Sequence, residues 1–88
     1  MEKQPFKEHK IGKNSTIRHY DNKIKKEDLP WVRNPEDMTI EPLSNNDWLF
    51  QIDNELPIPI DKNIFIPKEI YHRIIKGVTE LNLKVTKI

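Results

Sequence analysis

The fold class predicted from this sequence depends on one stretch, PKEIYHRIIKGVT, which spans residues 67–79. Pro67 suits the first position of a helix, where the missing amide proton costs nothing. The apolar residues that follow recur at the three- and four-residue spacing of one helix face, at Ile70, Tyr71, Ile74, Ile75 and Val78. We therefore predict a helix over residues 68–79, with Gly77 either ending it or weakening its last turn.

Strands are predicted on both sides of this helix. Residues 38–43 and 47–53 flank a serine and two asparagines at 44–46, which are turn-forming residues, and the pattern favours a hairpin. Residues 81–86 alternate between apolar and polar side chains and predict a C-terminal strand. In the second arm of the hairpin, one face is predicted to carry Trp48, Phe50 and Ile52.

Proline limits the segment between the hairpin and the helix. Residues 56–60 read Leu-Pro-Ile-Pro-Ile, and proline has no amide proton to donate to a neighbouring strand. We therefore predict an extended strip here rather than a central strand. Together these elements predict an α+β domain over residues 38–88, in which one helix covers a small antiparallel sheet made of the hairpin and the C-terminal strand.

Residues 1–37 predict an extended arm that precedes this domain. The apolar residues of 1–26 fall at irregular spacings, and an acidic linker with two prolines follows. Residues 1–26 carry eight basic and three acidic residues, whereas 27–63 carry two basic and nine acidic, and 64–88 carry five and two. Such charge blocks could attract one another, or the basic ends could seek an anionic surface. We expect the domain to stay folded when residues 1–26 are deleted.

Length and composition exclude several classes of protein. With 88 residues there is room for one small core. The absence of cysteine excludes disulfides and thiolate chemistry and fits a reducing compartment. Two glycines are too few for the loops that cradle nucleotide phosphates. The polar start resembles neither a secretory signal nor a membrane span, which favours a cytoplasmic location, or a virion if the gene belongs to a phage.

No catalytic residue, cofactor or metal site is predicted. The two serines lie outside any nucleophile motif. We interpret His9, His19 and His72 as surface histidines, because two lie in the arm and the third lies on a helix without a second ligand at a suitable spacing. The acidic residues of the middle segment are interpreted as a solvated edge of the sheet. These observations favour a protein that is not an enzyme.

The first functional hypothesis is therefore a non-catalytic assembly or accessory subunit, and an origin in a phage or mobile element suits its size and composition. It binds a protein partner, or a second copy of itself, through residues of the arm: Phe6, Ile11, Ile17, Tyr20 and Trp31. For Trp31 the alternative is that it folds back onto the protein's own sheet. The second hypothesis is a small nucleic-acid-binding regulator that uses the arm and a basic helix face formed by Lys68, Arg73 and Lys76.

Overall fold

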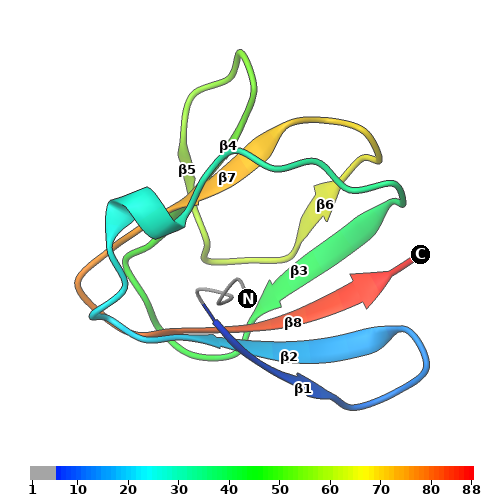
Figure 1. Ribbon diagram of the computed structural model, residues 1–88, viewed down its shortest axis with the longest axis horizontal. Coiled ribbons are helices and arrows are strands. Elements are labelled where there is room, and N and C mark those ends of the chain that lie inside the picture. The colour runs from blue at the N-terminus through cyan, green and yellow to red at the C-terminus, as the bar shows by residue number, and fades with distance from the viewer. Residues whose placement is uncertain (1–5) are drawn as a thin grey trace.

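Two antiparallel β-sheets form the framework of the protein, in a computed structural model that describes residues 6–88 (Figure 1). The five-stranded sheet has the order β1 (Lys7–Lys10), β2 (Ser15–Tyr20), β8 (Leu81–Lys87), β3 (Met38–Pro42) and β6 (Ile64–Ile66). The three-stranded sheet has the order β5 (Ile58–Pro59), β4 (Leu49–Ile52) and β7 (His72–Ile75). A short 3-10 turn, η1 (Lys26–Asp28), is the one helical element of the described residues.

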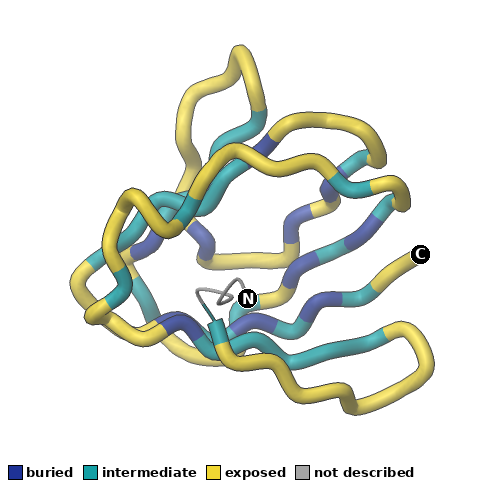
Figure 2. Tube along the Cα trace, viewed as in Figure 1, coloured by how far each residue is buried: buried dark blue, intermediate teal, exposed yellow. Residues whose placement is uncertain are grey.

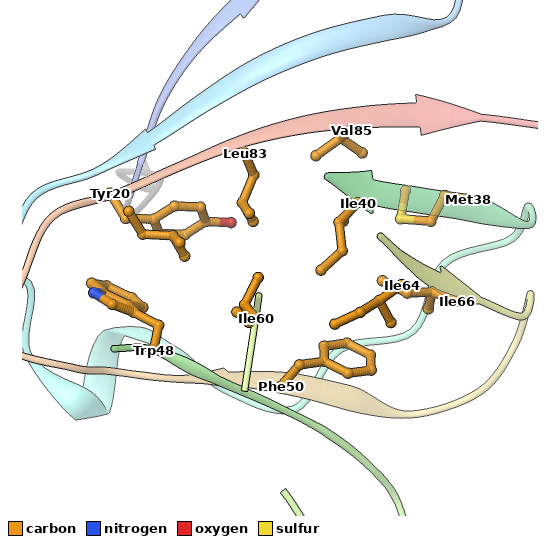
Figure 3. Packing of buried hydrophobic residues seen from close by; sticks show 11 residues of the cluster. Tyr20, Met38, Ile40, Trp48, Phe50, Ile60, Ile64, Ile66, Leu83 and Val85 are labelled. Carbon is orange, nitrogen blue, oxygen red and sulfur yellow. The ribbon is translucent and has the colours of Figure 1, made fainter. Parts of the chain in front are cut away.

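The hydrophobic core lies between the two sheets (Figure 3). Strand β8 illustrates this arrangement: its inward residues Leu81, Leu83 and Val85 are buried, and the residues between them are not. Trp48 and Phe50 enter the core from the smaller sheet. Burial of each such side chain contributes roughly 1.5–3 kcal/mol. In Figure 2 most of the buried positions lie along the strands, whereas the connecting loops are largely exposed.

The predicted helix over residues 68–79 is wrong, and with it the α+β fold class. Residues 72–75 form strand β7, which pairs with β4 so that Ile74 lies opposite Phe50. Glu69 has a φ of 63°, a left-handed conformation that interrupts any helix starting at Pro67. Of the apolar residues that match the helical period, Ile74 and Ile75 lie in β7, on opposite faces of the strand, and pairing with β4 selects the strand.

The predicted hairpin is also wrong, although both of its strands exist. Strands β3 and β4 belong to different sheets, and residues 43–48 connect one sheet to the other. Strand β3 pairs instead with β8 and β6, which lie far from it in sequence. The strand predicted over residues 81–86 is confirmed as β8. The proline strip contributes only β5, at the edge of the smaller sheet, where its missing amide donors cost least.

The N-terminal arm expected in front of the fold is a β-hairpin. Strands β1 and β2 pair along four positions, from Lys7 opposite His19 to Lys10 opposite Thr16. Strand β2 then pairs with β8 along six positions, so it is an internal strand of the larger sheet, between β1 and β8. Of the proposed arm of 1–37, residues 1–5 lie outside the described residues. The described residues contain no helix with the length and hydrophobicity of a membrane span.

Candidate functional site

A cavity of about 110 Å³ opens between the N-terminal hairpin and strand β7. Phe6, Arg18 and Tyr20 line it from the hairpin side, and the first three residues of β7 line it from the smaller sheet. Segment 28–32, which follows η1, closes a third side and is tied to β7 by two backbone hydrogen bonds between Val32 and His72, of 2.9 and 2.8 Å. The cavity therefore lies at one edge of the core, where the two sheets separate.

His72 is the buried polar residue of the core, with 6% of its surface exposed. Its Nδ1 lies 3.0 Å from the backbone oxygen of Ile70, and because a carbonyl only accepts, Nδ1 carries the proton and donates it. In the neutral ring the lone pair is therefore on Nε2, which forms no hydrogen bond with another residue of 6–88. Because no fully buried side-chain nitrogen or oxygen within residues 6–88 lacks a partner, this Nε2 atom retains some contact with solvent.

The surroundings keep the His72 ring neutral near pH 7. Burial lowers the pKa of His72 below its ordinary value of 6.5. The hydrogen bond to Ile70 opposes this shift, and the positive charge of Arg18 adds to it. A neutral imidazole with a defined tautomer is a proton acceptor, so the residue has the properties of a general base.

Arg18 is one of two arginines that line this cavity, with Arg73, and its position is fixed by contacts on β1. It lies opposite Glu8 in the hairpin, and its Nε donates to Glu8 Oε2 at 2.9 Å. Its guanidinium carbon lies 4.4 Å from the centre of the Phe6 ring. In β2 it also lies opposite Leu83, a core residue of β8, so it belongs to the inward face of the sheet. The guanidinium is therefore held at the cavity wall before any ligand arrives.

Tyr20 adds a hydroxyl group to the same wall. Its ring is 3% exposed and packs against Trp48, with 5.6 Å between ring centres. Burial raises the pKa of Tyr20 above its ordinary value of 10.0, while the charge of Arg18 and a hydrogen bond from it act in the opposite direction. The phenol stays protonated near pH 7 and offers a hydrogen-bond donor. A base, two arginine cations, a hydroxyl and the carboxylate of Asp28 thus line one small cavity.

Sequence reasoning missed Arg18 and His72 as site residues. A helix over 68–79 places His72 away from its apolar stripe, but in a strand it points the same way as Ile74, two residues further on. Similarly, Arg18 shares a strand face with Tyr20, a pattern that becomes visible once residues 15–20 are recognised as a strand. The interpretation of His72 as a surface histidine is wrong.

The residues predicted to bind a partner are not gathered at one place. Phe6 and Tyr20 line the cavity, whereas Ile11 lies exposed just after β1 and Ile17 is half-buried on the opposite face of β2 from Tyr20. Trp31 is partly exposed and lies under Arg73, whose guanidinium carbon is 4.6 Å from the ring centre. Partner binding through these residues stays a prediction.

Two of the three residues in the predicted basic face come together. Arg73 and Lys76 line one hollow beside the cavity, but Lys68 lies apart, in the turn after β6, where its backbone N–H donates to Asp37 Oδ1 at 2.7 Å. The reason is again the missing helix. Arg73 is the second residue of strand β7 and Lys76 is the residue after it, whereas Lys68 lies outside the strand. Among residues 6–88, no group of three or more His, Cys, Asp or Glu residues is arranged to hold a metal ion.

Solved structures show a clear likeness to this fold. A DMSP lyase, DddQ, from Ruegeria pomeroyi DSS-3 matches with a TM-score of 0.68 and 14% identity, over 83% of this chain and 36% of the lyase. A cupin domain from Bordetella pertussis Tohama I matches with a TM-score of 0.61 and 14% identity, over 100% and 99% of the two chains. A candidate mannose-6-phosphate isomerase from Ralstonia eutropha JMP134 matches with a TM-score of 0.61 and 14% identity, over 93% and 82%.

At these identities the likeness shows the fold alone, which is a cupin-like arrangement of two antiparallel sheets. The chain spans about a third of the length of the lyase. No protein-family profile and no curated protein sequence matches the chain.

The comparisons correct the functional hypotheses. Neighbours that share the fold include a lyase and a candidate isomerase. They contradict the hypothesis of a non-catalytic assembly subunit of phage or mobile-element type, together with its alternative, a nucleic-acid-binding regulator. The expectation that the protein is not an enzyme is contradicted by the same neighbours. The structural basis of that hypothesis, an α+β body with a docking arm, is also absent from residues 6–88.

Proposed function

We propose that this protein binds a small organic acid or carbonyl compound in the cavity between β2 and β7, and that it acts there as an acid–base enzyme of the lyase or isomerase type. His72 is the proton acceptor, and Arg18 and Tyr20 hold the oxygen on which charge develops. One observation carries the proposal: His72 uses Nδ1 to bond the chain at Ile70, and its ring lines the same cavity as a fixed arginine.

The chemical step follows from the three groups. The bond that breaks is the C–H bond next to the carbonyl or carboxyl carbon of the ligand, and its proton moves to Nε2 of His72. The electron pair moves into the carbonyl group, where the charge of Arg18 and the hydroxyl of Tyr20 stabilise it. When the α-carbon carries a hydroxyl group, that hydroxyl gives its proton to the former carbonyl oxygen and the proton on Nε2 adds to the former carbonyl carbon, which gives an isomer. When the β-carbon carries a leaving group, the electron pair expels that group, which gives elimination. A positioned base of this kind contributes roughly 10²–10⁴-fold to a rate.

The volume of the cavity limits the size of the bound portion. A 150 Å³ cavity in a protein core holds one benzene, which suggests about 25 Å³ for each heavy atom and about four heavy atoms in 110 Å³. This is the size of a short carboxylate or carbonyl fragment. The apolar residues of the wall, such as Phe6, Leu29 and Ile74, suit the carbon atoms of such a fragment.

The test combines binding with hydrogen exchange. The probes are acetate, propionate, pyruvate and lactate, and binding is followed by amide chemical shifts, with exchange of the α-hydrogen measured in D2O. We expect shifts centred on Arg18, Tyr20 and His72. His72→Gln removes exchange but retains binding, whereas Arg18→Gln weakens binding. His9→Gln is the matched control, because His9 lies exposed on β1.

Three outcomes decide the proposal. Binding without exchange in the unaltered protein supports the cavity as a binding site and removes the enzymatic step. Absence of shifts in the cavity with every probe, in a folded protein, overturns the site itself. Equal loss of exchange in His9→Gln and His72→Gln overturns the role of His72.

A cytoplasmic location remains part of the proposal, since the chain has no cysteine to suit an oxidising compartment.

A further inference from the structure

A second hollow, of about 150 Å³, adjoins the cavity and is lined by three cations. Lys26 comes from η1, Arg73 from β7 and Lys76 from the residue after β7, and Leu29, Ile74 and Ile75 form the apolar remainder of the wall. The hollow shares Leu29, Arg73 and Ile74 with the cavity. No carboxylate lines it, and none of the three cations forms an ion pair with another residue of 6–88.

Two of these cations are held in place by neutral groups. Arg73 donates from Nε to Gln51 Oε1 at 2.9 Å and lies over the Trp31 ring, so its two terminal nitrogens remain for a ligand. Lys76 donates from Nζ to the backbone oxygens of Asn22 and Gly77. An ammonium group has three N–H donors, so one remains. Arg73 and Lys76 are therefore ordered, while their charges are not neutralised by the described residues.

The nearby carboxylate of η1 is directed elsewhere. Asp28 lines the first cavity and not the hollow, and its Oδ2 accepts from the backbone N–H of Lys25 at 3.3 Å. Lys26 is fixed at its backbone, where its carbonyl accepts from the Leu29 N–H at 3.1 Å, and its side chain is exposed. Three positive charges around so small a space repel one another, and a bound anion offsets that repulsion.

We propose that this hollow is a binding site for a phosphate group, either inorganic phosphate or the phosphate of a small monoester. Two negative charges balance more of the cationic cluster than the single charge of a carboxylate does. The planar fork of Arg73 and the point charges of the two lysines are both suited to phosphate oxygens. At about 25 Å³ for each heavy atom, a volume of 150 Å³ holds about six, and phosphate has five.

The experiment is a titration at constant ionic strength, followed by amide shifts, with inorganic phosphate, a small monoester such as glycerol phosphate, and acetate as probes. We expect phosphate to shift residues 26, 73 and 76 and to bind more tightly than acetate. Because a hydrogen bond to a charged group is worth roughly 1.5–3 kcal/mol, Arg73→Gln and Lys76→Gln should each weaken binding about tenfold or more. Lys26→Gln gives the same direction, and its exposed side chain makes loss of folding a minor concern.

The matched control is Lys68→Gln, which removes a lysine of the same charge outside the hollow. If Lys68→Gln weakens phosphate binding as much as Arg73→Gln does, the binding is a general attraction to a basic protein, and the site is overturned. Failure of both inorganic phosphate and the monoester to shift residues 26, 73 and 76 overturns it as well. A monoester that binds while inorganic phosphate does not identifies the ester as the source. Phosphate binding that survives in His72→Gln stands even when the acid–base activity proposed for the cavity fails.

Discussion

The carboxylate of Asp47 occupies the space that a side chain on Gly77 would need. A methyl group on Gly77 would lie 2.6 Å from Cγ and 2.8 Å from the carbonyl carbon of Asp47. The same carboxylate accepts hydrogen bonds from the backbone N–H groups of Val78 and Thr79, at 3.0 and 3.1 Å, and from the Thr79 hydroxyl at 2.9 Å. The start of β4 and the loop before β8 are therefore joined through one side chain.

Replacing Gly77 with alanine should destabilise the protein. The new methyl group meets the backbone of Asp47, which cannot move without disturbing Trp48, a fully buried core residue. Overpacking of this kind costs about 1–3 kcal/mol. Urea denaturation of Gly77→Ala measures the loss. Gly12→Ala is the matched control, since a methyl group there meets only Ser15 Cβ, at 3.9 Å. Equal stability of the two variants would contradict the close packing at Gly77.

Acid should weaken the link made by Asp47. The N–H groups of Val78 and Thr79 lower the pKa of Asp47 below its ordinary value of 3.8, so folding favours the ionised form. The stability that it contributes is present above pH 3.8 and is lost as the pH falls through the lower folded-state value. We expect the difference in urea midpoint between the unaltered protein and Asp47→Asn to be largest near pH 6 and to shrink below pH 3.8. Asp61→Asn is the control.

His72 should couple stability to pH in a different range. Its pKa is lowered by burial, so between that value and 6.5 the unfolded chain binds a proton that the folded chain does not. Stability therefore falls as the pH drops below 6.5, and His72→Gln removes this part of the dependence. NMR titration of the imidazole carbon-bound hydrogens gives the midpoint directly. A midpoint for His72 at or above 6.5 in the folded protein is the result that contradicts its burial.

Local alternation was sufficient to predict β4 and β8, two of the strands that contribute aromatic or aliphatic residues to the core. Trp48 and Phe50 are buried on one face, as the pattern of 47–53 predicts, and β8 follows the pattern of 81–86. The pairing of these strands was not predictable, because β3 meets β8 and β6 at long sequence separation and no local signal distinguishes that arrangement from a hairpin.

The candidate site was hidden for a related reason. In β2 the inward positions include Arg18, and in β7 they include His72, so polar residues interrupt the apolar alternation at the places where the cavity lies. A pattern search that looks for apolar faces passes over such strands. Residues that serve a cavity break the rule by which the rest of the core is recognised.

Deletion of residues 1–26 should abolish folding rather than leave a domain intact. The deletion removes β2, which pairs with β8 from Ser15 opposite Thr86 to Tyr20 opposite Leu81, and it removes the Tyr20 ring from its contact with Trp48. One side of the central strand β8 would then lack hydrogen-bond partners, and part of the core would face water. Circular dichroism and thermal melting of the truncated chain should show no cooperative transition.

Point variants separate the loss of the core contact from the loss of chain length. Tyr20→Ala removes a buried aromatic ring, a change that typically costs about 3–5 kcal/mol, which is a large fraction of the stability of a small domain. Ile11→Ala truncates an exposed side chain of the same hairpin and should change stability by less than about 0.5 kcal/mol. A truncated chain that melts cooperatively, or a Tyr20→Ala variant as stable as Ile11→Ala, would show that the hairpin is dispensable and would restore the independent domain over 38–88. The expected result instead makes the hairpin part of the core, because the inward face of β2 completes both the hydrophobic interior and the wall of the cavity.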